Sequence, residues 1–197
     1  IQTGQKLVQI LPINDTTITG TWTDSYPYNS ISIYAFHPMY IDLRQVGELK
    51  NTKLNNRFKK LQNKLNALDT IDYEAVNKAK REYLRCSYGE SGLKILSSLE
   101  FKEFFKRNQS WLVPYAAFSY LRDKYATADF KCWKEHKYDP AEIAVLCDEK
   151  SETYKDIAFY YYIQYLLHIQ LSAVSNYAKA HNIILKGDIP IGISRSS

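Results

Sequence analysis

The chain has 197 residues, of which 45% are hydrophobic and 24% are charged. This balance is ordinary for a single globular domain and argues against an intrinsically disordered chain. No apolar run reaches the roughly 18 to 20 residues that a membrane span requires, so we expect no membrane partner.

Cysteine usage indicates the cellular compartment. The three cysteines, Cys86, Cys132 and Cys147, are too few for a disulfide framework, and their odd number favours a reducing environment. The first residues show neither the basic start nor the apolar segment of an export signal. We therefore expect a cytoplasmic protein. The chain starts almost inside a predicted strand and stops just after another, so we also expect it to be part of a longer polypeptide.

Two short apolar segments predict buried β-strands, one near 7–13 and one near 183–189. The second directly follows a long helical pattern, and a helix leading into a buried strand is typical of a parallel sheet. Two strands cannot form such a sheet alone. Either the missing strands lie outside this chain or on a partner, or the chain is a helical protein with a small sheet.

The residues between these strands are mostly helical in pattern, and the region of about 50–150 contains most of them. Asp72 and Asp139 are suited to begin helices as N-caps. The last helix carries a wide apolar stripe and is expected to be largely buried. The predicted helices cover about 53–68, Asp72 toward Ser98 with an interruption near Gly89 and Gly92, Pro114 to Tyr125, Asp139 to about Glu149, and about 153–181.

One segment is strongly basic. Lys50–Lys64 holds six Lys or Arg residues and no acidic residue. Nucleic-acid binding is conceivable for such a run. The apolar positions already assign one helix face to the core, so the lysines are more simply explained as a solvated face. We expect no nucleic-acid partner.

The sequence offers little support for a metal or a cofactor. Cys132, His136 and Cys147 lack the paired spacing and the fourth ligand of a structural zinc site. The glycine-rich nucleotide motifs and the common hydrolase motifs are absent as well. We expect neither a metal nor a cofactor.

The most unusual segment is SYPYNSISIYAFHPMYIDL, Ser25–Leu43, which holds four tyrosines, a phenylalanine and two prolines on a predicted loop. This loop follows the first strand, and Asp188 follows the second. Ligands collect at the carboxyl ends of parallel strands. Carboxylates beside flat aromatic rings describe a carbohydrate pocket. The alternative is that the tyrosines merely pack a long loop and Asp188 caps a turn, and composition alone leaves both readings open.

Four segments in register carry a resemblance to a known family. They are QILPIND, DSYPYNS with FHPMYIDL, WLVPYAAFSYLRDKY, and the C-terminal YYIQYLLHIQLSAVSNYAKAHNIILKGDIPIGISRSS. Together they resemble the amylomaltase family of 4-α-glucanotransferases, and within it the branch of plant-type cytosolic disproportionating enzymes. The resemblance implies an α/β fold, part of a TIM (β/α)8 barrel with large helical insertions, so that residues 1–197 form a partial catalytic barrel domain.

The resemblance also implies an activity: transfer of a glucosyl unit from maltose or a maltooligosaccharide to an α-1,4-glucan acceptor such as glycogen, with retention of configuration. The family's three catalytic carboxylates follow from an Arg-Ile-Asp motif onward, and no such motif occurs before Ser197. We therefore expect no catalytic residue in this chain and expect the rest of the barrel as its partner.

Residue by residue, Tyr28 matches the family tyrosine that packs against the donor sugar, and Ser25 matches a nearby serine. Asp188 matches the aspartate that hydrogen-bonds donor hydroxyls, and Asp24 begins the Tyr28 loop and could brace it. The extra Tyr26 and the His37-Pro38 pair depart from ordinary bacterial members and point to the maltose-using branch.

A hypothesis of another class is a helical glycan-binding or interaction module without chemistry. The two hypotheses differ in whether the polypeptide continues through an Arg-Ile-Asp strand.

Overall fold

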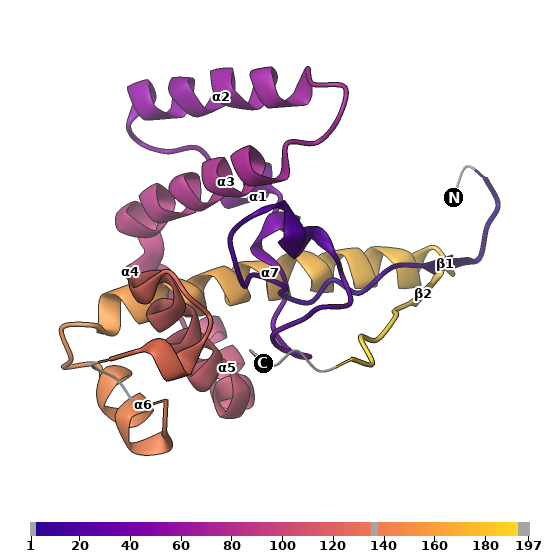
Figure 1. The fold of residues 1–197 in the computed structure, drawn as a ribbon. Coiled ribbons are helices and arrows are strands. Elements are labelled where there is room, and N and C mark those ends of the chain that lie inside the picture. Colours follow the sequence, from indigo (N-terminus) through magenta and orange to yellow (C-terminus); the bar gives the residue numbers. More distant parts are fainter. Residues whose placement is uncertain (1–2, 135–137, 193–197) are drawn as a thin grey trace.

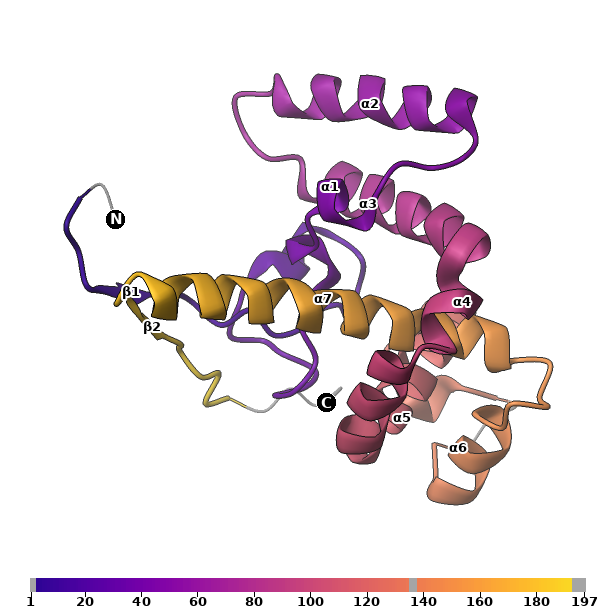
Figure 2. The ribbon, with the colours of Figure 1, turned by 180° about the vertical axis from the view of Figure 1, so that it is seen from behind.

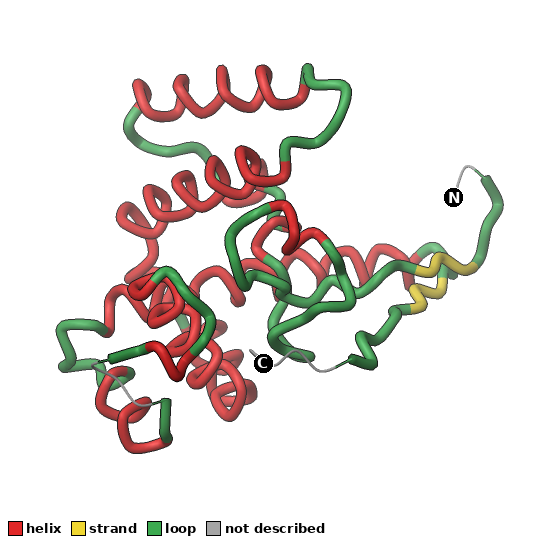
Figure 3. The backbone as a smooth tube through the Cα atoms, viewed as in Figure 1, coloured by secondary structure: helices red, strands yellow, loops and turns green. Residues whose placement is uncertain are grey.

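The computed structural model describes residues 3–134 and 138–192 of the chain. Within these residues the protein is mostly helical, with a single small sheet (Figure 1 and Figure 3). Strands β1 (Leu7–Gln9) and β2 (Ile184–Lys186) pair in parallel, with Leu7 opposite Ile184. The helices between them are α1 (Leu43–Val46), α2 (Thr52–Asn66), α3 (Tyr73–Ser87), α4 (Leu93–Leu96), α5 (Leu99–Tyr125), α6 (Pro140–Leu146) and α7 (Tyr154–Ala180).

The two strands lie inside the ranges that the sequence predicts and are parallel, but each has three residues only. The expectation that they are buried is wrong for this chain: Leu7 is 51% exposed and Ile184 63% exposed. The reason is that, among the described residues, neither strand has a further strand at its side, so the apolar faces that a larger sheet would cover lie open. Each strand also has one edge at which its backbone N–H and C=O groups are not paired with another strand, and sheet proteins normally protect such edges.

Helices α5 and α7 form the centre of the structure and lie against one another (Figure 1). Leu112 and Leu121 of α5 are fully buried with Ile157 of α7. Residues 157–167 of α7 are buried on all sides, whereas Lys155 and Asp156 in the first turn are exposed and Val174 is 52% exposed. The expectation of a largely buried last helix therefore holds for one half of α7. In the described part of the chain, no helix is both long and apolar enough to cross a lipid bilayer.

Helix α5 corrects one prediction. Pro114 does not begin a helix but lies inside α5, which starts at Leu99 with the Ser98 side chain accepting from the Phe101 N–H. A proline in a helix interior removes one backbone hydrogen bond and costs about 3 kcal/mol. Burial of apolar α5 side chains on both sides of Pro114 offsets this cost. This burial depends on the packing of α5 against other helices, so it could not be predicted from the residues around Pro114.

The predicted interruption near Gly89 and Gly92 is confirmed. A π-helical turn, Tyr88–Gly92, separates α3 from α4. A Cβ atom on Gly92 would lie 2.1 Å from the Tyr88 ring. Glycine is therefore required where this turn folds the aromatic ring back onto its own backbone.

Helix α2 stands away from the α5–α7 centre, with α3 and α1 between them, as both views show (Figure 1 and Figure 2). Its contact with α3 is a small cluster of Leu49, Phe58 and Tyr83. All six basic residues of Lys50–Lys64 are exposed, which confirms the interpretation as a solvated face. Asn51 and Asp72 cap α2 and α3, respectively, through their side chains.

Candidate functional site

The aromatic segment forms a long loop whose two ends are fastened together. The Asp15 N–H donates to the Ala35 carbonyl at 2.8 Å, and the His37 N–H donates to the Ile13 carbonyl at 2.9 Å. This short antiparallel pairing closes a loop over residues 16–34, which we call the aromatic loop. It follows the carboxyl end of β1. The prediction that the aromatic stretch is irregular backbone is confirmed, since it contains only short 3-10 turns.

Asp24 organises the start of the aromatic loop from inside. Its buried carboxylate accepts hydrogen bonds from the backbone N–H groups of Ile18, Thr19 and Gly20, the last at 2.7 Å. Gly20 has φ +74°, a conformation that favours glycine. The Asp24 carboxylate therefore braces the backbone of residues 18–20 from within the loop.

Tyr28 and Asp188 come together although 160 residues separate them: the Tyr28 hydroxyl donates to Asp188 Oδ2 at 2.9 Å. Tyr28 comes from the aromatic loop, and Asp188 lies two residues beyond the end of β2. The hydrogen bond to Asp188 raises the pKa of the Tyr28 phenol, because it holds the proton on the oxygen. Parallel pairing of the strands places the two loops on the same side.

Ser25 and Asp24 lie at a different place from this pair. Both line a cavity of about 360 Å³, the loop cavity, together with Trp22, Tyr40 and Tyr73. Ser25 is exposed and Trp22 is 68% exposed, so this cavity opens to the surface. The structure thus pairs Tyr28 with Asp188 and places Asp24 with Ser25 beside a neighbouring hollow.

A buried polar network lies under the aromatic loop and was not predicted from the sequence. Asp15 accepts from the Tyr115 hydroxyl at 2.7 Å and from Thr17, and Arg122 donates to the Thr17 carbonyl at 2.9 Å. Burial acts to raise the pKa of Asp15, but the charge of Arg122 and the hydrogen bonds from Thr17 and Tyr115 outweigh it and lower that pKa. The available signal was Arg122 itself, a charge within the apolar pattern of a helix.

His37 belongs to the same network. Its Nδ1 accepts from the Met39 N–H at 3.0 Å, and its Nε2 lies 2.7 Å from the Tyr73 hydroxyl. Burial lowers the pKa of His37 despite the opposing charge of Asp15. A nitrogen that accepts a backbone hydrogen bond carries no proton, so the imidazole is neutral.

The cysteines do not assemble with other ligands in the part of the chain that the structure describes, where no group of three metal-binding side chains is present. Cys132 is exposed and donates to Asp129, and Cys147 is half-buried. His136, considered with them in the sequence, lies outside the described residues.

Comparison with known proteins decides the family. The family model described as 4-alpha-glucanotransferase matches residues 1–197, the whole chain. The chain belongs to the 4-alpha-glucanotransferase family. The resemblance found in the sequence motifs is thereby confirmed, and a non-catalytic binding module is not favoured.

Relatives within the 4-alpha-glucanotransferase family match over nearly the whole chain. The 4-alpha-glucanotransferase DPE2 of rice is 38% identical over 198 residues, covering 100% of this chain and 21% of its own length. The 4-alpha-glucanotransferase of Chlamydia caviae is 32% identical, covering 98% of this chain and 35% of its own length. The chain therefore spans a minor part of its relatives' length.

A solved structure supports the fold. An amylomaltase from Streptococcus agalactiae, in complex with acarbose, matches with a TM-score of 0.72 at 19% identity, covering 100% of this chain and 38% of the other. At this identity the likeness concerns the fold alone.

Proposed function

We propose that the protein carrying this chain is a 4-α-glucanotransferase that moves a glucosyl unit from maltose to an α-1,4-glucan acceptor with retention of configuration. The match of the family model to residues 1–197 supports the reaction class. The Tyr26 and His37-Pro38 departures, through the resemblance that they carry, support maltose as the donor. We also propose that the enzyme works in the cytoplasm, which the three free cysteines support.

The contact between Tyr28 and Asp188 is the observation that carries this proposal for the chain itself. An aromatic ring offers a flat face to a sugar, and a carboxylate accepts hydrogen bonds from sugar hydroxyls. Asp188 Oδ2 accepts from Tyr28 and Oδ1 accepts from the Ile189 N–H, which leaves acceptor capacity on both oxygens. The pair is therefore fixed in place and still able to hold the donor sugar.

Ser25 and Asp24 have supporting parts. Ser25 borders the loop cavity and supplies a hydroxyl to the bound glucan there. The Asp24 carboxylate is occupied by backbone N–H groups of the loop, so its part is to hold the loop that presents Tyr28.

The chain supplies two neighbouring strands of a TIM barrel in this proposal. β1 and β2 would be the second and third barrel strands, and residues 1–197 a partial catalytic domain with helices inserted over about 50–150. The open faces of Leu7 and Ile184 are then covered by the remaining strands. These strands, on the rest of the polypeptide, are the partner of this chain.

Retention of configuration requires two displacements. A carboxylate nucleophile forms a glycosyl-enzyme intermediate, and a second carboxyl group acts first as acid and then as base. We place these carboxylates outside residues 1–197. The role of this chain is to bind and orient the donor sugar, so that the scissile bond meets groups from the later strands.

The test is release of free glucose from maltose with glycogen as acceptor. We expect release by the full-length protein and none by residues 1–197 alone. If the full-length protein releases no glucose from maltose or maltooligosaccharides, the proposal is wrong.

A further inference from the structure

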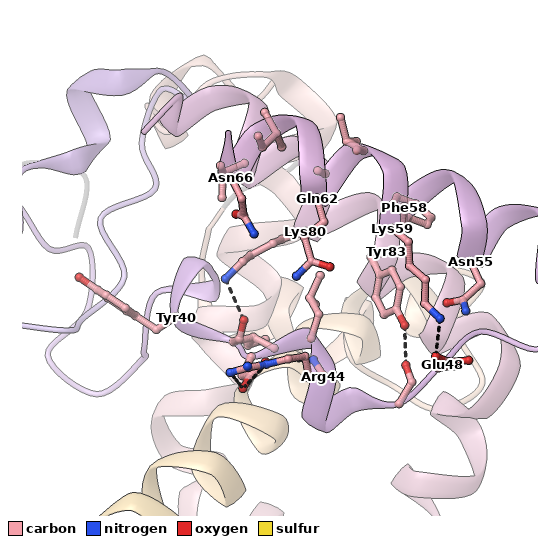
Figure 4. Close-up of a pocket in the computed structure, with 18 residues that line it drawn as sticks. Tyr40, Arg44, Glu48, Asn55, Phe58, Lys59, Gln62, Asn66, Lys80 and Tyr83 are labelled. Atoms are coloured by element: carbon pink, nitrogen blue, oxygen red, sulfur yellow. Dashed lines mark hydrogen bonds and ion pairs between the residues drawn. The ribbon is translucent and has the colours of Figure 1, made fainter. Parts of the chain in front are cut away.

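A large cavity lies away from the Tyr28–Asp188 pair. It has a volume of about 670 Å³ and is enclosed by α1, α2 and α3 (Figure 4). We call it the α2 cavity. Ligand pockets of proteins have volumes of roughly 300 to 1,000 Å³, so this one has room for a ligand.

The α2 cavity exists because α2 touches α3 at one end only. The contact at Phe58 and Tyr83 closes this end, and the rings meet edge to face at 5.2 Å. Beyond Phe58, the C-terminal half of α2 turns Leu61 and Leu65 toward the cavity without filling it. The apolar surface there lacks the contacts that normally hold an amphipathic helix.

Two amide side chains on α2 reach into the α2 cavity. Gln62 and Asn66, one helical turn apart, point toward Lys80 of α3 (Figure 4). No described residue receives or donates a hydrogen bond at either amide. Amides that offer both donors and acceptors match the hydroxyl groups of a sugar.

The charged side chains around the α2 cavity are already engaged by other groups of the protein. Arg44 pairs with Asp42 at 2.8 Å, and Lys59 pairs with Glu48 at 2.6 Å. Lys80 donates to the backbone carbonyls of Met39 and Ile41, the latter at 2.8 Å. Arg44 and Lys59 thus have carboxylate partners, and Lys80 donates to two carbonyl groups, so the lining suits a hydroxyl-rich ligand better than an anion.

Tyr40 connects this cavity with the loop cavity. It is 54% exposed and lines both, and in Figure 4 its ring stands at the edge of the α2 cavity and points away from it. A chain molecule that lies along the aromatic loop can therefore continue past Tyr40 into the space beneath α2. A single small sugar cannot occupy both.

We infer that the α2 cavity is a second binding site for an α-1,4-glucan chain, which passes over Tyr40 and is held by Gln62 and Asn66. The identity of the ligand rests on the proposed function. The site explains why the C-terminal half of α2 is held off α3, since the glucan fills the space between the helices.

The test is hydrogen exchange of the full-length protein with maltoheptaose, read at the peptide that covers α2. At ten times the dissociation constant, opening of a segment that binds the ligand falls by about tenfold, and exchange slows accordingly. We expect this protection in the unchanged protein and its loss in the variant that combines Gln62→Ala with Asn66→Ala. The matched control is Asn63→Ala, because Asn63 lies on the same helix and does not line the cavity.

Three outcomes overturn the inference: no protection of α2, protection that survives the Gln62→Ala and Asn66→Ala changes, or equal protection by inorganic phosphate. Glucose release from maltose, measured on the same preparations, reports separately on the proposed function. Release without α2 protection defeats the second site only, whereas α2 protection without release defeats the transferase proposal only.

Discussion

Gln164 of α7 binds the backbone of Phe36 with both ends of its amide. Its Oε1 accepts from the Phe36 N–H at 2.9 Å, and its Nε2 donates to the Phe36 carbonyl at 2.8 Å. Further along α7, Gln170 binds the N–H and the carbonyl of Asp42 in the same way, at 2.9 and 3.0 Å. Two glutamines of α7 thus form the pairs of hydrogen bonds with the segment after the aromatic loop that a neighbouring strand would form. Helix α7 in turn leads to β2 and Asp188.

The change Gln164→Leu should therefore weaken the fold. Gln164 is 1% exposed, so leucine would leave the Phe36 N–H and carbonyl without their partners beside a fully buried side chain. We expect the free energy of unfolding to fall by about 2 to 4 kcal/mol, measured by urea titration. Gln170→Leu is the matched control and should cost less, because Gln170 and Asp42 are only half-buried and water can replace the amide. Equal losses for both variants would contradict the reasoning.

The change Asp188→Ala should lower the rate of glucosyl transfer by about a hundredfold, since it removes the proposed contacts to the donor sugar, which would strengthen in the transition state. Tyr28→Phe keeps the ring but removes the hydroxyl that holds Asp188, and we expect a loss of about tenfold, equivalent to one hydrogen bond. Glucose release from maltose by the full-length protein measures both.

Tyr26→Phe is the control for Tyr28→Phe. Tyr26 is 60% exposed, and its ring lies 5.5 Å from that of Tyr28, without a bond to Asp188. Its hydroxyl should be dispensable for transfer. A near-normal rate for Asp188→Ala would remove Asp188 from the donor site.

The sequence predicted the helices better than the strands. Helical periodicity and capping residues such as Asp72 and Asp139 act locally, and α3 and α6 begin where those side chains accept from the backbone. The length of α5 was not predictable, because burial on both sides of Pro114 overrides the proline. Burial of a strand depends on neighbouring strands. The apolar residues of β1 therefore predicted burial correctly only for a larger sheet, and within the described residues Leu7 is exposed.

The site was predictable in part for a similar reason. Tyr28 and Asp188 were both singled out, and parallel strands make their loops converge. Whether they touch depends on how the aromatic loop is closed and fastened, which is decided by Gln164 and the Asp15 network. Apart from Arg122, no local pattern marks these residues, since they act through contacts 100 or more positions apart in the chain, as for Tyr115 with Asp15 and Gln164 with Phe36.

The change Asp24→Ala should loosen the aromatic loop. Alanine leaves the N–H groups of residues 18–20 without their acceptor, and we expect a loss of about 2 to 4 kcal/mol in the free energy of unfolding, with faster proteolysis within residues 16–26. Asp129→Ala is the control, because the Asp129 carboxylate also accepts from a backbone N–H, that of Lys131, but is exposed. Its loss should stay below about 1 kcal/mol. Unchanged proteolysis in Asp24→Ala would show that the loop does not depend on this carboxylate.

Stability should fall as the pH drops below about 6.5, and His37 should account for part of the fall. Burial lowers the pKa of His37 from its ordinary value of 6.5, so the unfolded chain takes up a proton that the folded chain refuses. This stability is present above pH 6.5 and is lost as the pH falls toward the folded pKa, at no more than about 1.4 kcal/mol per pH unit. Protonation at Nδ1 would also break its bond from the Met39 N–H.

His37→Asn separates the titration from the structural role. The asparagine side-chain oxygen can still accept from the Met39 N–H at the start of the 3-10 turn Pro38–Tyr40, but it does not titrate. Urea titrations at pH 7.5 and pH 5.5 should show a smaller loss for the variant than for the unchanged protein, by about 1 kcal/mol. Equal losses in the two proteins would mean that His37 is protonated in the folded state, and the neutral imidazole inferred from its hydrogen bonds would be wrong.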